Sequence, residues 1–220
     1  FGGGDTGVTA DLNSHLPGPC IAIRADIDAL PLEEESDVPF RSTVKGVMHA
    51  CGHDAHAAIL LGVASILSKV KEDLPGKVRL IFQPAEESGL NSGAKHMIAG
   101  GALDGVDAII GLHVWSSLPS GVFGLRSGGM MASADVFELT VTGKGGHGGR
   151  PQEVFDPTIA AATIITTMQT IISREIDPLD TAVLSIGKIE SGTAPNIIPE
   201  TAKITGCVRS TSPDVRASME

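Results

Sequence analysis

The segment KVRLIFQPAEE, residues 77–87, carries the clearest fold signal in this chain of 220 residues. Residues 77–83 are rich in apolar and β-branched side chains and are followed by Pro84, which predicts a buried strand that ends at a breaker. Two adjacent acids, Glu86 and Glu87, come directly after this strand. Acids are also common in the first turn of a helix, where they favour the helix dipole, so the pair alone does not identify a site.

Two more apolar segments predict strands that end in polar side chains. Residues 107–112 run into His113, and residues 20–24 lead to Asp26 and Asp28. Sheets with helical crossovers collect their sites at the carboxyl ends of strands, so we expect these groups and the two glutamates to converge. Ordinary turn capping is the alternative for the two aspartates.

Helices are expected to connect these strands. Residues 54–71 are apolar nearly all round, which is typical of a helix buried against a sheet. Asp54 is suited to cap its N-terminus. A short helix is expected at 91–100, where Gly100 and Gly101 end it.

The segment MHACGHDAH, residues 48–56, gathers three imidazoles, a thiol and a carboxylate just before the predicted helix. Such donors favour a transition-metal ion. The spacing is not that of a zinc finger, because no Cys-x-x-Cys pair occurs in the chain. A polar loop with a buried cysteine is the alternative for any one of these residues, and the downstream donors favour metal for the group.

Composition excludes several classes of protein. The formal charge of −10 argues against nucleic acid or an anionic membrane as a partner. Three widely separated cysteines, Cys20, Cys51 and Cys207, do not form a disulfide framework, so a reducing compartment such as the cytoplasm is expected. No apolar run has transmembrane length and no signal peptide is evident. The first residue is Phe1, and we interpret the sequence as an internal piece of a longer protein.

The predicted fold class is α/β, with two domains. Residues 1–117 are expected to form part of a catalytic metal-binding domain, with a mixed sheet and flanking helices. A segment rich in Gly, Ser and Pro follows, as at a domain boundary. Residues 118–220 are expected to form part of a smaller α+β domain with a ferredoxin-like β-α-β-β-α order. Its predicted elements are strands at 134–141, 182–190 and 201–209 and helices at 156–174 and from Pro213.

Six motifs together resemble the M20 metallopeptidase family, in the branch of amidohydrolases that act on N-acyl amino acids. That branch includes hippurate hydrolases and auxin-conjugate hydrolases. The motifs occur in this order: RADIDALP (24–31), MHACGHDAH (48–56), QPAEE (83–87), GLH (111–113), GGHGGRP (145–151) and GTAPNIIP (192–199).

This resemblance implies a site for two divalent metal ions, Mn, Zn, Co or Ni. Cys51 would bridge them, and His53, Glu87 and His113 would be further ligands. Asp28 would orient a ligand, the usual partner of a metal-bound imidazole. Asp26 stands where other branches carry a ligating histidine, which leaves its role open. His49 and His56 are candidates for supporting the ligands.

The resemblance also implies the catalytic and substrate-binding groups. Glu86 would be the general base, and Asp28 is assigned to the catalytic set with it. His147 would hold the carbonyl oxygen as it becomes an oxyanion, and Asn196 and Arg209 would bind the substrate's carboxylate. The second domain would act as a lid and form a homodimer. A further ligating histidine would come from beyond this sequence, so we expect the piece alone to have little activity.

The function implied is metal-dependent hydrolysis of the amide bond of a small N-acyl amino acid, giving a carboxylate and a free amino acid. A dipeptidase, or a deacetylase of a biosynthetic intermediate, is the alternative within the family. A non-catalytic relative with a structural metal cluster is the alternative outside it.

Overall fold

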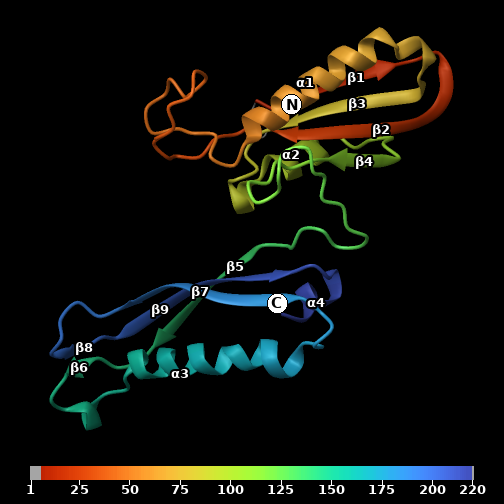
Figure 1. The fold of residues 1–220 in the computed structure, drawn as a ribbon. Coiled ribbons are helices and arrows are strands. Elements are labelled where there is room, and N and C mark those ends of the chain that lie inside the picture. The colour runs from red at the N-terminus through yellow and green to blue at the C-terminus, as the bar shows by residue number, and fades with distance from the viewer. Residues whose placement is uncertain (1–5, 220) are drawn as a thin grey trace. The chain divides into compact units, whose positions relative to one another are not determined.

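The computed structural model describes residues 6–219, which divide into two compact units (Figure 1). The first unit ends at Val122 and the second begins at Phe123, so the division falls in the Gly-, Ser- and Pro-rich segment. No regular helix or strand occurs between the last strand of the first unit and the first strand of the second. None of the helices within residues 6–219 has the length and apolar character needed to cross a lipid bilayer.

The first unit contains a mixed four-stranded sheet with the order β1-β3-β2-β4. The strands are β1 (Val8–Asn13), β2 (Leu16–Asp26), β3 (Pro75–Gln83) and β4 (Ala108–Gly111). β2 is parallel to both β3 and β4, as expected for strands joined by helical crossovers. β1 pairs with β3 in the antiparallel direction and was not predicted.

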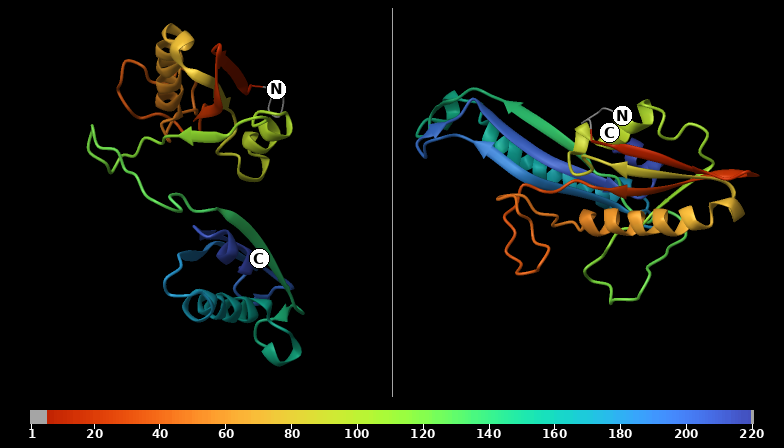
Figure 2. Two further views of the ribbon diagram at one scale, coloured as in Figure 1. Left: turned by 90° about the vertical axis from the view of Figure 1, so that its right-hand side faces the viewer. Right: turned by 90° about the horizontal axis from the view of Figure 1, so that it is seen from above.

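Helices lie on opposite faces of this sheet (Figures 1 and 2). On one face, Leu60 of α1 (His53–Lys69) packs with Ala25 and Leu80. On the other face, Met97 of α2 (Gly93–Ala99) packs with a second set of strand residues that includes Ala22 and Ile81. Successive strand residues point to opposite faces, so neighbouring residues of β2 and β3 enter different cores.

One prediction about α1 was wrong. Its N-cap is Gly52, which makes no side-chain capping bond, and Asp54 lies inside the first turn. The helix packs against the sheet, as predicted, but only one of its sides is buried there. Leu60 is buried, whereas Leu61 and Ile66 are 60% and 64% exposed, because the sheet covers only one side of the helix. An apolar sequence therefore does not show how many sides of a helix are covered.

The second unit contains an antiparallel sheet with the order β5-β9-β7. Its strands are β5 (Asp135–Thr142), β7 (Ala182–Ser191) and β9 (Thr201–Ser210). α3 (Pro157–Thr170), which continues in a π-helical turn (Ile171–Glu175), packs against one face through Ala161, and α4 (Pro213–Ser218) follows β9. The predicted β-α-β-β-α order is observed.

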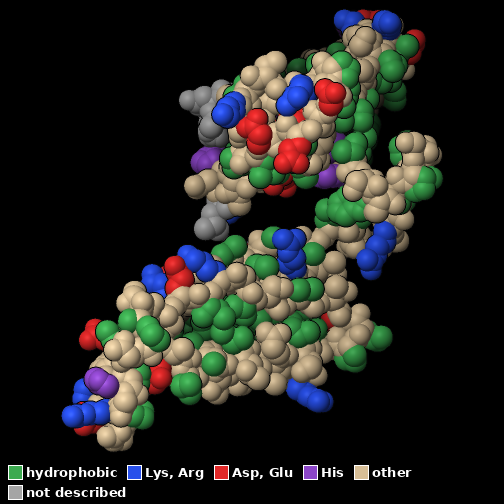
Figure 3. Space-filling view, turned by 60° about the vertical axis from the view of Figure 1, so that its left-hand side comes forward, with side chains coloured by type: hydrophobic (Ala, Val, Ile, Leu, Met, Phe, Trp, Pro, Cys, Tyr) green, Lys and Arg blue, Asp and Glu red, His purple; other side chains and the backbone are tan. Residues whose placement is uncertain are grey.

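The opposite face of this sheet carries exposed apolar side chains, including Val136 and Val183. On the lower body in Figure 3, hydrophobic side chains gather in the middle of the face shown, and most of the charged side chains lie around them. A two-stranded ribbon of β6 (Gly146–His147) and β8 (Ile197–Ile198) lies at one end of the unit (Figure 1). This ribbon contains one of the predicted substrate-binding residues.

Candidate metal centre

The strand register brings three chain segments to one edge of the first sheet. Asp26 of β2 lies opposite Gln83 of β3, and Arg24 lies opposite Gly111 of β4. The residues that follow these strands therefore leave the sheet side by side. The convergence predicted from the strand ends is confirmed.

The turn after β3 is sharp enough to direct two acids to this edge. Ala85 has φ +51°, in the left-handed region that costs a residue with a Cβ about 1–2 kcal/mol. Its carbonyl accepts a hydrogen bond from the Gly93 amide at 3.2 Å. Glu86 and Glu87 follow at once, and both are solvent-accessible. Strained backbone of this kind is often found where side chains must be aimed.

A second tight turn joins the loop to α1. Gly52 has φ +83°, and a Cβ placed there would lie 2.4 Å from Cγ2 of Val114. Glycine at this position permits both the backbone conformation and the close approach of the chain after β4. As a result, Cys51 and His53 flank a turn that sits directly against the segment after His113.

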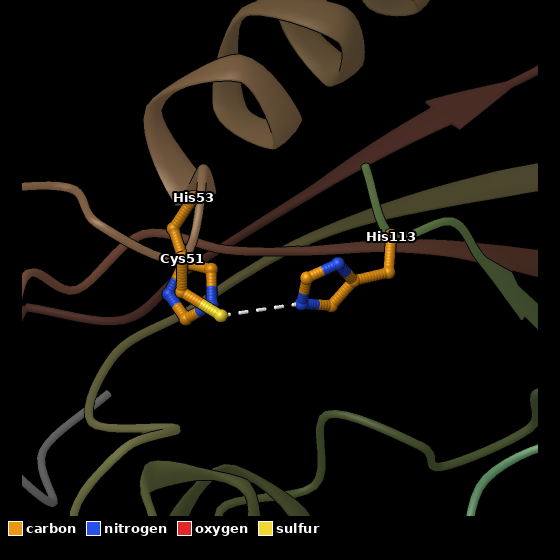
Figure 4. A group of neighbouring side chains, drawn as sticks. All are labelled: Cys51, His53 and His113. Carbon is orange, nitrogen blue, oxygen red and sulfur yellow. Dashed lines mark hydrogen bonds between the residues drawn. The ribbon is translucent and has the colours of Figure 1, made fainter. Parts of the chain in front are cut away.

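Cys51, His53 and His113 form the centre of the cluster (Figure 4). The Cys51 thiol points toward the His113 ring, with Sγ 3.4 Å from Nε2. One donor atom from each of the three residues lies within 4.8 Å of the others, and the same holds for His53, Glu86 and Glu87. His53 belongs to both groups, so the two groups of donors adjoin at this residue.

Asp28 contacts two of the proposed ligand residues, His53 and Glu87. Its Oδ1 lies 3.0 Å from Nδ1 of His53, and its Oδ2 accepts a hydrogen bond from the Glu87 amide at 2.9 Å. The bond at Nδ1 leaves Nε2 of His53 facing the cluster. His53 is 1% exposed, and its Nε2 has no hydrogen-bond partner among the described residues. A buried imidazole nitrogen without a partner is costly unless something binds it.

The His113 ring is oriented in a similar way. Its Nδ1 lies 2.6 Å from the carbonyl oxygen of Val114, and a carbonyl can only accept, so the ring proton is on Nδ1. The lone pair of Nε2 then faces Cys51. The ring of Trp115 packs edge-on against His113 with centroids 5.6 Å apart.

The spacing and charge of these donors fit divalent metal ions. Among the proposed ligands, Cys51 Sγ lies 3.4 Å from His113 Nε2, and His53 Nε2 lies 3.9 Å from a Glu87 oxygen, too far for a hydrogen bond. Two ligands about 2.0–2.3 Å from one ion at tetrahedral angles are about 3.3–3.8 Å apart. Burial raises the pKa of the Cys51 thiol to about 11, and the nearby carboxylates of Glu87, Glu86 and Asp26 add to the rise. Cations would offset this surplus of negative charge and favour the thiolate.

Asp26 and His56 form a separate pair, although they lie close enough to His53 to be candidate ligands. Asp26 Oδ1 accepts from His56 Nδ1 at 2.5 Å, and its Oδ2 accepts from Arg24 at 2.7 Å. Burial acts to raise the pKa of Asp26, but the His56 hydrogen bond and the Arg24 charge outweigh it and hold the pKa below its ordinary value. With both oxygens occupied, Asp26 is committed to these partners.

The sequence interpretation left the role of Asp26 open and treated His56 as a supporting candidate only. One signal for His56 was present, since it follows His53 by one helical turn and so shares its face of α1. His49 is used differently, because its Nδ1 lies 3.0 Å from the carbonyl oxygen of Asp28. This contact holds the loop that contains His49 against the segment that follows β2.

The second unit brings together two of its three predicted substrate-binding residues. His147 pairs with Ile197 in the ribbon, and the Gly148 amide donates to the Asn196 carbonyl oxygen at 2.9 Å. The Gly149 amide donates to Nδ1 of His147 at 2.9 Å, which places the ring proton on Nε2. His147 is therefore prepared to act as a hydrogen-bond donor from an exposed position.

Arg209 does not join this pair within the second unit. It lies near the end of β9, opposite Val183 of β7, whereas the ribbon lies near the start of β9 (Figure 1). At about 3.4 Å per strand residue, most of the length of β9 separates Arg209 from the ribbon.

Comparison with known proteins identifies the family. The model of peptidase family M20/M25/M40 matches residues 22–211. Thermostable carboxypeptidase 2 of Saccharolobus solfataricus is 51% identical over 96% of this chain and 54% of its own length. The N-acetyl-L-cysteine deacetylase of Bacillus subtilis is 49% identical over 96% of this chain and 50% of its own length. The chain thus spans about half the length of these curated relatives.

A solved structure supports the same assignment. A Bacillus subtilis protein described as a dinuclear metal-binding peptidase of the M20 family superimposes with a TM-score of 0.80. It is 42% identical, and the match covers 97% of this chain and 53% of that one. Sequence, fold and donor set agree. The chain belongs to the M20/M25/M40 family of hydrolases.

Proposed function

We propose that the protein containing this chain is a metal-dependent amidohydrolase that cleaves the amide bond of N-acyl amino acids, giving a carboxylate and a free amino acid. The observation that carries the proposal is the position of Glu86 beside the ligand cluster. Its carboxylate is solvent-accessible and, within residues 6–219, makes no hydrogen bond or ion pair. A site that only stabilised the fold would not require an uncommitted acid.

Cys51, as a thiolate, His53, Glu87 and His113 would hold two divalent ions. The ions would supply Lewis-acid polarisation of the amide carbonyl and lower the pKa of water. Asp28 would keep Nε2 of His53 directed at the cluster and fix the backbone of Glu87, because it bonds to both. The Bacillus subtilis dinuclear peptidase supports a count of two ions.

Glu86 would move the proton. As general base it takes a proton from the attacking water while the water oxygen adds to the carbonyl carbon. As the carbon–nitrogen bond breaks, the same carboxyl group returns the proton to the departing amine, which leaves poorly without it. Two adjacent glutamates allow this division of work, since Glu87 binds metal and Glu86 remains available.

The second unit would supply substrate contacts. His147 presents an Nε2 proton, as a donor to a developing oxyanion requires. Asn196 lies beside it and is proposed to bind the substrate's carboxylate, with Arg209 as a further contact. We further propose that this unit acts as a ferredoxin-like lid and forms a homodimer, for which the exposed Val136 and Val183 offer apolar contact area.

The test is Glu86→Gln in the full-length protein. The change removes the base and keeps the size of the side chain, so hydrolysis should fall by about a hundred- to ten-thousandfold with metal content unchanged. Activity would be assayed on N-acetyl, N-benzoyl and indoleacetyl amino acids, and metal content by elemental analysis.

Two control variants make the result specific. Glu87→Gln should lose both metal and activity, whereas Glu72→Gln, on an exposed turn outside the site, should lose neither. Full hydrolysis by Glu86→Gln with its metals bound would refute the assigned base. If neither wild type nor variant hydrolyses any of these compounds while both bind metal, the alternative of a non-catalytic relative with a structural cluster is favoured.

The alternative substrates within the family remain open to the same assay. The similarity to a protein named N-acetyl-L-cysteine deacetylase supports an N-acyl amino acid as the substrate, and the similarity to a protein named thermostable carboxypeptidase supports a peptide. Adding dipeptides to the panel would separate these two cases by their relative kcat/KM.

A further inference from the structure

A network of hydrogen-bonded polar side chains lies next to the proposed metal ligands. Gln83 Oε1 accepts from Arg24 Nε at 2.9 Å, and Arg24 donates to Asp26 at 2.7 Å. Asp26 in turn bonds to His56, which meets the backbone of Val114. Asp26 and His56 are 1% and 2% exposed. These contacts link the ends of β2 and β3 to α1 and to the segment after β4.

The partners of His56 determine where its proton lies. The Val114 amide can only donate, so Nε2 of His56, 2.9 Å away, must accept. The single ring proton is then on Nδ1, facing Asp26. Both nitrogens are used, which distinguishes His56 from His53, whose Nε2 has no partner within residues 6–219.

Val114 is the residue through which His56 reaches the site. Its amide donates to His56, and its carbonyl oxygen accepts from Nδ1 of His113. The rings of His56 and His113 also meet edge-on, with centroids 4.7 Å apart. A shift of the Val114 backbone would therefore turn the His113 ring, whose Nε2 faces Cys51.

We propose that His56 is a positioning residue that, held by Asp26 in its Nδ1–H form, fixes the Val114 backbone and so directs the His113 ring into the metal cluster. This inference rests on the proposed metal site, and it assigns the buried Asp26–His56 pair a role other than binding metal. An apolar side chain could fill the same space, but it would leave the Val114 amide without an acceptor and Oδ1 of Asp26 without a donor. Buried polar groups left without a partner destabilise the folded state.

Two similar substitutions test the role of each ring nitrogen. In His56→Gln the side-chain amide reaches the position of Nε2, so its oxygen can accept from Val114. In His56→Asn the shorter amide reaches the position of Nδ1, so it can donate to Asp26 but not reach Val114. Cys51→Ser serves as a control that removes a ligand without touching this hydrogen-bond chain.

Two properties are measured on the full-length protein in the absence of substrate. The first is hydrogen exchange of the Val114 amide in metal-free protein by NMR. The second is affinity for Zn²⁺ alone, by competition with a chromophoric chelator. Circular dichroism establishes that each variant is folded.

His56→Asn should speed Val114 exchange by about tenfold or more, the effect of one lost hydrogen bond. It should also weaken Zn²⁺ binding by about 10–100-fold, as is typical when a group that orients a ligand is lost. His56→Gln should lie closer to wild type in both. Cys51→Ser should lose Zn²⁺ affinity but keep Val114 protected.

The proposal is overturned if His56→Asn matches wild type in either readout, or if the Gln and Asn variants are equally impaired. If His56→Asn does not fold, His56→Gln is compared with wild type alone. Loss of protection of the Val114 amide in His56→Gln would then overturn the proposal. Because no readout uses hydrolysis, a protein that cleaves none of the amides would refute the proposed function and leave this result intact.

Discussion

Gly52 and Val114 approach so closely that a single added carbon at Gly52 would lie 2.4 Å from Cγ2 of Val114. Gly52 separates two proposed ligands, and Val114 follows a third. The contact therefore joins the loop before α1 to the segment after β4.

Gly52→Ala should disturb both the fold and the metal site. The left-handed backbone costs about 1–2 kcal/mol with a Cβ, and the clash adds to this. Either the Cys51–His53 turn or the Val114 segment must move, so Zn²⁺ affinity should fall as well. Urea unfolding and Zn²⁺ competition measure the two effects.

Gly62→Ala is the matched control for this substitution. Gly62 lies in the middle of α1, and a Cβ there would meet nothing within 4 Å. Alanine should stabilise the helix by about 0.5–1 kcal/mol and leave Zn²⁺ affinity unchanged. Equal effects of the two substitutions would contradict a special requirement for glycine at position 52.

The pair Asp11–Arg79 should make stability depend on pH. These residues are cross-strand partners in β1 and β3, and the hydrogen bond from Arg79 lowers the pKa of Asp11 to about 2. A carboxyl with a lowered pKa stabilises the fold fully above its unfolded pKa of about 3.9 and loses this contribution as the pH falls toward 2.

Asp11→Asn should therefore reduce the free energy of unfolding at pH 7, by about 1 kcal/mol or less because the pair is partly exposed. The difference in the free energy of unfolding between wild type and variant should remain constant down to about pH 5 and shrink between pH 4 and pH 3. Urea titrations at these pH values measure it. A gap that does not change with pH would show that the Asp11 charge does not contribute.

The helices α1 and α3 should respond differently to loss of an acid at their N-termini. Asp156 caps α3 by accepting from the amides of Thr158 and Ile159 at 2.8 and 3.4 Å. Asp54 of α1 makes no capping bond and acts only through its charge. Asp156→Ala should cost about 1 kcal/mol, and Asp54→Ala about 0.5 kcal/mol or less.

Salt separates the two effects. Added NaCl should screen the Asp54 contribution while leaving most of the Asp156 contribution, which comes from hydrogen bonds. Asp156→Asn is the control, because asparagine caps as well as aspartate. If thermal unfolding showed equal and equally salt-sensitive losses, Asp156 would not act as a cap.

The parallel core of the fold could be predicted because the buried strands β2, β3 and β4 carry apolar runs that a sequence displays directly. β1 escaped prediction because it is an edge strand with the sequence VTADLN, in which an acid is paired across the sheet to Arg79. Its strand character comes from a partner far away in the chain.

The site was predictable in its residue types and less so in its connections. Donors at strand ends indicated Glu87 and His113, and the family motifs indicated their roles. The link from His56 to Val114 depends on which backbone amide lies next to a ring, which no spacing along the chain reveals. The start of α1 was missed for a similar reason, because the left-handed turn at Gly52 begins the helix before the expected cap at Asp54.

The sheet order also has a consequence for assembly. Because β2 lies between β3 and β4, the donors of the cluster meet only after segments distant in the chain have paired. No short peptide holds the complete set, and an unfolded chain would bind an ion weakly. An ion that binds only the paired state shifts the folding equilibrium in proportion to its free concentration, so added metal would raise the melting temperature of the first unit.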